Sequence, residues 1–186
     1  TINADTSSGL ILTSDTSGLI SFQSAGVEKA GVNATGLTGD GSQLTSLPSA
    51  GLSDYSTFVN STEKVTVSAT AATGTINYDT NTQSVVYYTS AAVGDWTINF
   101  RASSGATLNS VIATGEAITL VHLVTLTGAE YRNTTVQVDG SSITPEWQGG
   151  SAPTEGNINS IDSYAYTIIK TGDAAFTILA ALTQFA

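Results

Sequence analysis

The single histidine is the first residue whose chemistry has to be considered. Catalysis by a serine nucleophile requires an imidazole that takes the serine proton, and only His122 can supply one within this chain. His122 belongs to an alternating segment, between Leu120 and Val124, which predicts that it shares one face of a strand with apolar side chains. This context favours a core or interface histidine with satisfied hydrogen bonds over a catalytic base. One histidine also excludes metal sites built from two or three histidines of one chain.

Carboxylates are the second candidate chemistry. A glycoside hydrolase needs two carboxyl groups that face one sugar, and the chain has six glutamates, at Glu28, Glu63, Glu116, Glu130, Glu146 and Glu155. They are spread along the sequence, mostly at expected strand ends or in loops, so no pair stands out. The absence of cysteine excludes disulfides and thiolate metal sites. We therefore predict no enzyme, no catalytic residue, no metal and no cofactor, and a polysaccharide depolymerase is the weakest alternative.

The loop 143–157 is the most distinctive stretch for binding. It contains two of the three prolines and one of the two tryptophans. One hypothesis is that Trp147 and Gln148 are exposed and contact a sugar or a protein partner, because an indole beside polar groups suits both. The other is that Trp147 closes the end of a β-sandwich or packs against a neighbouring subunit. The sequence leaves both open.

Charge narrows the range of partners. The chain carries 15 acidic and five basic residues, which gives a formal net charge of -10. The basic residues are scattered singly, at Lys29, Lys64, Arg101, Arg132 and Lys170. Binding to phosphates or to an anionic membrane surface needs clustered Lys and Arg, and no apolar run reaches the roughly 18 residues of a membrane span. We predict neither a nucleic acid nor a membrane as partner.

Composition predicts an all-β protein with two unlike parts. Thr, Ser, Val, Ile, Gly and Tyr dominate, whereas the residues that build exposed helices are scarce. Up to residue 50 Phe22 is the only aromatic, and all tyrosines and tryptophans follow later. We predict a repetitive β stem over 1–35, a Gly/Ser/Pro joint over 36–52, and a β-sandwich or jelly-roll head over 53–186.

Period-two patterns predict eight strands in the head. Trp96, Ile98 and Phe100 alternate with polar residues and indicate a half-buried strand. The polar loop 79–82 predicts a hairpin between two of the strands. The expected strands cover residues 65–67, 75–78, 84–89, 96–101, 117–126, 134–138, 164–170 and 175–182.

The stem is built from short repeats. Residues 5–11 are nearly repeated at 15–20, and a glycine followed by an apolar residue then recurs every five positions. One apolar residue per turn is not a core, so such a stem becomes stable when identical chains wrap around each other and pool these side chains. The predicted inward positions are Leu10, Leu19, Val27, Val32 and Leu37. A flexible Gly/Ser/Thr linker is the alternative.

Three segments carry a resemblance: Gly36 to Leu47, Pro145 to Pro153, and Tyr164 to Thr171. They resemble fibre-like structural virion proteins of marine tailed phages, cyanophages especially. The resemblance implies a homotrimer with a slender shaft and a β head, present on the particle surface as a tail fibre, decoration or appendage, with other virion proteins as partners. It also implies host attachment, so an adhesin head that binds a host glycan or receptor is the main alternative to a purely structural role.

Overall fold

The computed structural model describes residues 20–24, 27–33, 36–39 and 62–186. The chain divides into two compact units, Thr1–Val59 and Asn60–Ala186. The described residues are predominantly β-strand, as the composition predicts, with one short helix. Two of the five predicted inward stem positions, Leu10 and Leu19, lie outside the described residues.

The first unit contains a three-stranded antiparallel sheet. Its order is β1 (Ile20–Ser24), β2 (Val27–Asn33) and β3 (Gly36–Gly39). Strand β3 falls at the start of the segment predicted as a joint. In the register, Ile20, Val32 and Leu37 stand opposite one another. A β-bulge between β1 and β2 shifts the register, so that Val27 pairs with the last residue of β1.

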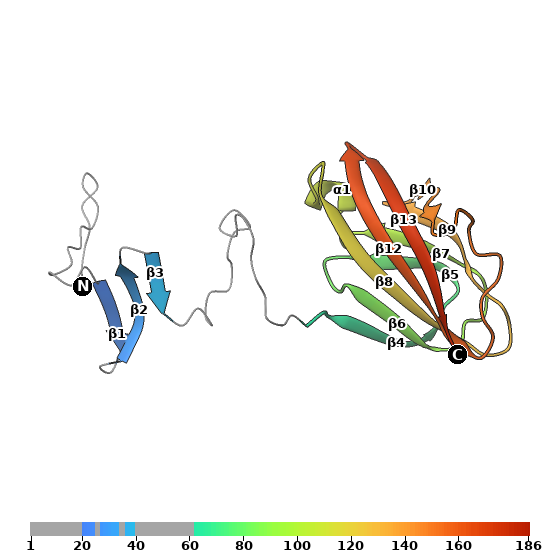
Figure 1. Cartoon of the computed structure of the whole chain (residues 1–186), viewed down its shortest axis with the longest axis horizontal. Helices are drawn as coiled ribbons and strands as arrows, with labels where there is room; N and C mark the ends of the chain where they lie inside the picture. The colour runs from blue at the N-terminus through green and yellow to red at the C-terminus, as the bar shows by residue number, and fades with distance from the viewer. Residues whose placement is uncertain (1–19, 25–26, 34–35, 40–61) are drawn as a thin grey trace. The chain divides into compact units, whose positions relative to one another are not determined.

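The second unit consists of two mixed sheets (Figure 1). The six-stranded sheet has the order β11 (Glu146–Trp147), β13 (Ala175–Phe185), β12 (Ser160–Gly172), β8 (Ala117–Leu126), β6 (Val85–Ser90) and β4 (Val65–Ala71). The four-stranded sheet has the order β10 (Ser141–Ile143), β9 (Asn133–Val138), β7 (Trp96–Arg101) and β5 (Gly74–Asp79). Helix α1 (Leu108–Val111) lies between β7 and β8. All eight predicted head strands are present, and the short strands β10 and β11 were not predicted.

The strands from β4 to β9 alternate between the two sheets. In one sheet β4, β6 and β8 are parallel neighbours, and in the other β5, β7 and β9 are. The chain therefore makes three successive turns, each of which adds one strand to each sheet. Strand β12 then pairs antiparallel with both β8 and β13.

This winding makes the predicted hairpin between 75–78 and 84–89 wrong, because β5 and β6 lie in different sheets. Of the two predicted head architectures, the jelly roll is wrong, because its strands pair antiparallel whereas β4, β6 and β8, like β5, β7 and β9, are parallel neighbours. The loop between them is held by backbone hydrogen bonds to other turns: Asn81 N donates to Ala102 O at 3.1 Å, and Ser84 N donates to Lys64 O at 3.2 Å. A four-residue polar loop can thus connect two sheets as well as two neighbours in one sheet.

The core lies between the two sheets. Trp96, Ile98 and Phe100 are all fully buried, as their alternation predicts. Phe100 packs against Tyr166 of the opposite sheet with ring centroids 5.0 Å apart, and Trp96 packs against Tyr164 at 5.7 Å. Such aromatic pairs stabilise a fold by about 0.5–1.5 kcal/mol beyond their burial. In the described part of the chain, no helix has the length and apolar character needed to cross a membrane.

Candidate binding groove beside Trp147

Trp147 lies on the edge strand β11, which pairs parallel with β13 opposite Ala180. Its ring meets two core tyrosines edge-on, with centroids 6.4 Å from Tyr164 and 6.3 Å from Tyr166. The indole is half-buried. It therefore covers the edge of the core on an edge strand of the sheet, and part of it stays accessible to solvent.

The accessible part of Trp147 lines a groove of about 540 Å³. A tight turn shapes one side: Gly150 N donates to Trp147 O at 2.9 Å, and Gly149 and Gly150 both have a φ of 83°. Residues that carry a side chain rarely adopt this backbone conformation, so the turn requires glycine at both positions. The groove is lined by Trp147, Gln148, Gly149, Ser151, Pro153, Thr154, Glu155, Leu182 and Gln184.

The groove presents an indole beside amide and carboxylate groups. The backbone amide of Gln148 donates to Ala180 O at 2.8 Å, which attaches the loop to β13. Gln148, Glu155 and Gln184 place polar side chains around the apolar surface of the ring. Amides and carboxylates accept hydrogen bonds from hydroxyl groups, and an aromatic ring packs against the apolar face of a sugar. The arrangement suits binding rather than reaction, because it gathers one carboxylate and no imidazole.

Asp162, on β12, anchors the far end of the same loop. Its carboxylate accepts hydrogen bonds from Asn157 N and from Ser160 Oγ, each at 3.2 Å. Burial raises the pKa of Asp162, and hydrogen bonds from Asn157, Ser160 and Gln184 oppose that rise. A glycine at position 156 is needed for packing, because a Cβ there would contact Tyr131 O. Neither Asp162 nor Gly156 was identified from the sequence as a support for this loop.

His122 occupies the centre of the aromatic core. It is fully buried on β8, and its ring is nearly perpendicular to those of Tyr88, at 5.4 Å, and Trp96, at 5.7 Å. Burial lowers its pKa to about 3. The prediction of a core histidine is confirmed, but the expectation of satisfied hydrogen bonds is wrong. Neither ring nitrogen has a hydrogen-bond partner among the described residues.

A second, polar cavity of about 350 Å³ lies over one end of the four-stranded sheet. Its charged groups are already paired: Arg101 Nε lies 2.6 Å from Asp79 Oδ1, and the Asp139 carboxylate accepts from Leu108 N at 2.7 Å and Asn109 N at 3.0 Å. These contacts hold the start of α1 and leave little charge for a ligand. Across residues 62–186 and the three N-terminal strands, no cluster of three potential metal ligands occurs.

Three of the five predicted inward stem positions fall on the N-terminal sheet. Val27 and Val32 lie on β2 and Leu37 lies on β3. No protein-family model, no curated protein and no solved structure matches this chain. Its function therefore has to be argued from its own residues.

Proposed function

We propose that this chain is a non-catalytic structural subunit of a tailed-phage particle, which forms a homotrimeric fibre, decoration or appendage on the virion surface. The observation that carries the proposal is the winding of β4 to β9 into stacked turns. Proteins built in this way grow along one axis, since each turn is stabilised mainly by its neighbours. That architecture suits an elongated particle component.

The stacking is supported at the corners of the turns as well as along the strands. Gly74 N donates to Asp95 O at 3.3 Å, and Trp96 N donates to Arg132 O at 3.1 Å, so each corner bonds to the next. Side chains repeat the contact, because Asn99 Nδ2 donates to Asn77 Oδ1 at 2.8 Å on the adjacent strand. Polar ladders of this kind strengthen stacked parallel strands.

The N-terminal sheet supports the proposal through its register. Val32 and Leu37, which share the glycine-apolar repeat, stand opposite each other, and Val32 also opposes Ile20. A row of apolar positions in a three-stranded sheet needs a partner surface, because a sheet of this size has no core of its own. Identical chains supply such a surface in an intertwined shaft.

The position of His122 supports a non-catalytic role. It is the only imidazole in the chain and lies fully buried among aromatic rings. A base must come within hydrogen-bond reach of the group that it deprotonates, and this ring has no access to a substrate from outside.

The oligomeric state is tested by replacing Val27 and Val32 together with Asp. Each inward Val contributes about 1 to 3 kcal/mol per chain through burial, and unpaired carboxylates around a common axis cost far more than the lost contact. The matched control is Ser21→Asp with Thr38→Asp, because both residues oppose Gly31 and lie on polar positions of the same sheet.

The readout is the mass in solution by light scattering, together with far-ultraviolet circular dichroism. The unaltered chain and the control should form trimers, whereas the Val27, Val32 double variant should separate along the N-terminal part and dissociate at a higher protein concentration than the control, with a folded head. A wild-type mass of 19.0 kDa would contradict the trimer. An intact trimer in the double variant would show that the N-terminal repeats do not hold the chains together. Antibody labelling of particles by electron microscopy tests the location, with label at the particle surface as the expected outcome.

The groove beside Trp147 favours a second function, attachment to a host glycan or receptor. The test is a glycan array with the whole oligomer and with the double variant Gln148→Ala, Glu155→Ala, which removes polar groups of the groove and keeps the indole that covers the edge of the core. Binding that the double variant loses would support attachment. Binding by neither protein would leave the structural role alone, and turnover of a host polysaccharide would reverse the non-catalytic assignment.

A further inference from the structure

The outer face of the six-stranded sheet carries apolar residues mixed with Ser and Thr across five adjacent strands, and Thr119 and Thr167 are hydrogen-bonded to each other there. Along each strand, residues that face the core alternate with residues that point away from it. Because of the pairing between strands, the outward residues of neighbouring strands lie in rows across the sheet. One row runs through Val65, Val85, Val121, Ala165 and Ala181. The next row begins with Val67, Tyr87 and Leu123 and ends with small hydroxyl residues.

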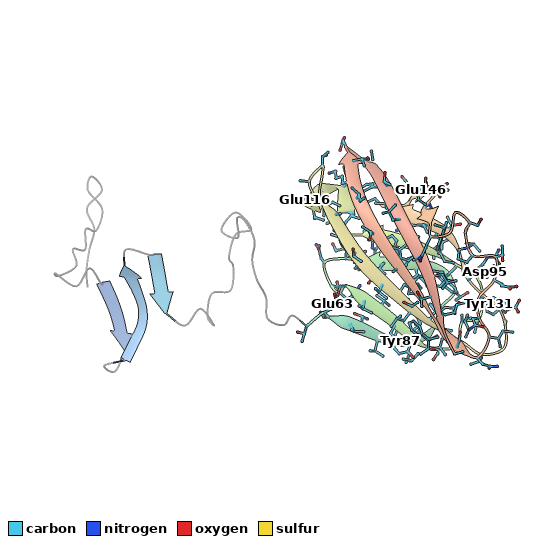
Figure 2. All side chains as sticks on the ribbon, in the orientation of Figure 1. Glu63, Tyr87, Asp95, Glu116, Tyr131 and Glu146 are labelled. Atoms are coloured by element: carbon cyan, nitrogen blue, oxygen red, sulfur yellow. The ribbon has the colours of Figure 1, made fainter. Side chains whose placement is uncertain are left out.

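Across these five strands the outer face carries no charge, and Glu146 on the sixth strand, β11, stands beside Leu179 at its edge. None of the outward positions on β4, β6, β8, β12 and β13 is Asp, Glu, Lys or Arg, although the chain has a net charge of -10. The nearest carboxylates border the face: Glu63 precedes β4, Glu116 precedes β8, and Glu146 is on the edge strand β11. Figure 2 labels these three glutamates, and Tyr87 on β6.

The outer face of the four-stranded sheet is different. There the outward positions hold the Asp79–Arg101 ion pair and the hydrogen-bonded Asn77 and Asn99. Of the seven large apolar residues that are exposed among the described residues, four lie on the outer face of the six-stranded sheet. Val65 and Val67 are on β4 at one side of this face, and Leu179 and Phe185 are on β13 at the other. The remaining three are Val93, Val111 and Ile158. A charge-free sheet face with exposed valine, leucine and phenylalanine side chains is a candidate interaction site.

We propose that this charge-free face, formed by β4, β6, β8, β12 and β13, packs against the same face of neighbouring copies of this chain. The inference rests on the homo-oligomer of the proposed function and assigns the surface by which the heads associate. Copies that each carry ten net negative charges repel one another, so they can approach closely only where both surfaces lack carboxylates. A second copy supplies a face with the same property.

The size of the face agrees with this occupant. The five strands are 6 to 13 residues long. With a spacing of about 4.8 Å and a rise of about 3.3 Å per residue, they present roughly 750 Å² per chain. A stable interface buries about 800 Å² on each partner. Two sheets pack face to face with their strands nearly aligned, and three such faces can enclose a common axis.

The absence of cysteine allows a direct footprint of this surface. Single variants Val67→Cys and Leu179→Cys place one thiol each on the face, and Val93→Cys is the matched control in the loop between β6 and β7. In the single chain Val67 is 65% exposed and Val93 is 63% exposed, so their thiols should react equally fast with a polar maleimide in a monomer. Circular dichroism checks that each variant is folded.

In the assembled protein we expect the thiols at positions 67 and 179 to react at least about tenfold more slowly than the one at 93, because an interface excludes solvent and reagent. Equal rates at the three positions in a protein whose mass shows an oligomer would overturn this face as the interface and leave the homo-oligomer standing. A wild-type mass of 19.0 kDa would overturn both.

A charge variant provides an independent check. Val67→Glu with Leu179→Glu should lower the mass of the assembly or raise the concentration at which it dissociates, whereas Val93→Glu should change neither. An unchanged assembly in the double variant would contradict the proposal, since buried like charges at a shared face are strongly unfavourable.

Discussion

Acid should destabilise the head through His122. The folded head holds the neutral imidazole, because burial lowers the pKa from its usual 6.5 to about 3. In the unfolded chain the ring is solvated and takes up a proton below pH 6.5. Between these two pKa values the unfolded state binds more protons than the folded state, so the free energy of unfolding falls as the pH falls. Above pH 6.5 both states are neutral and this contribution vanishes.

The magnitude follows from the two pKa values. Each pH unit below 6.5 costs up to 1.36 kcal/mol, so at pH 4.5 the free energy of unfolding should be lower by about 3 kcal/mol than at neutral pH. A domain is typically stable by about 5 to 15 kcal/mol, so the loss is measurable. The groups that face the ring are Tyr88, Trp96 and Tyr164. They do not titrate in this range, because burial raises the pKa of both tyrosines further above 10.

The assay is denaturant unfolding of the wild type and of His122→Phe between pH 7 and 4.5, at one protein concentration. Phenylalanine keeps an aromatic ring and removes the titration. Any packing cost of the larger ring is the same at every pH. The buried Asp162 has a raised pKa and therefore stabilises the folded state as the pH falls towards the usual 3.8, but it does so in both proteins and cancels in the difference. We expect the wild type to lose about 3 kcal/mol relative to the variant at pH 4.5. Parallel pH profiles would refute the assignment of a buried, neutral His122.

Three further substitutions test the packing that supports the groove and the stacked turns, each by its free energy of unfolding. Gly156→Ala should lower the free energy of unfolding by about 1 to 3 kcal/mol, because the added Cβ would meet Tyr131 O and lie 2.6 Å from Leu126 Cδ1. Gly128→Ala is the control, since its Cβ would contact nothing within 4 Å. Equal effects of the two substitutions would contradict the reasoning. Asn99→Ala should cost about 1 to 3 kcal/mol by leaving Gly140 N unpaired, and a neutral result would show that the ladder does not stabilise the turns. Lys170→Met should lower the free energy of unfolding by a similar amount and increase amide hydrogen exchange in α1. The reason is that Lys170 Nζ donates to the carbonyls of Asn109 and Ile112 at 2.5 and 3.0 Å. Unchanged exchange would contradict this role of Lys170.

Local patterns in the sequence were sufficient to predict that the strands exist. The alternation of Trp96, Ile98 and Phe100 predicted both a strand and its buried face, and the bounds of β8 matched the prediction. These features depend on neighbours two residues apart, which the sequence displays directly. The position of His122 in the core followed from the same periodicity. The unsatisfied state of its nitrogens did not, because hydrogen-bond partners come from other strands.

The pairing of strands was decided by the tertiary structure. Thr75 to Tyr78 and the strand after it suited a hairpin, yet their backbone groups bond to strands one turn away. Loop length does not distinguish the two connections here, because four residues can span both the roughly 4.8 Å between neighbouring strands and the roughly 10 Å between packed sheets.

The charge-free outer face had a signal in the sequence that the prediction did not use. In β8 the outward residues Val121 and Leu123 are as apolar as the inward ones, and continuous apolar strands of this kind are typical of sheets covered on both faces. The sequence by itself determined that these residues form strands with one buried face. Only the tertiary structure decided that five such strands lie side by side, because parallel neighbours are joined by hydrogen bonds between residues about 20 to 40 positions apart.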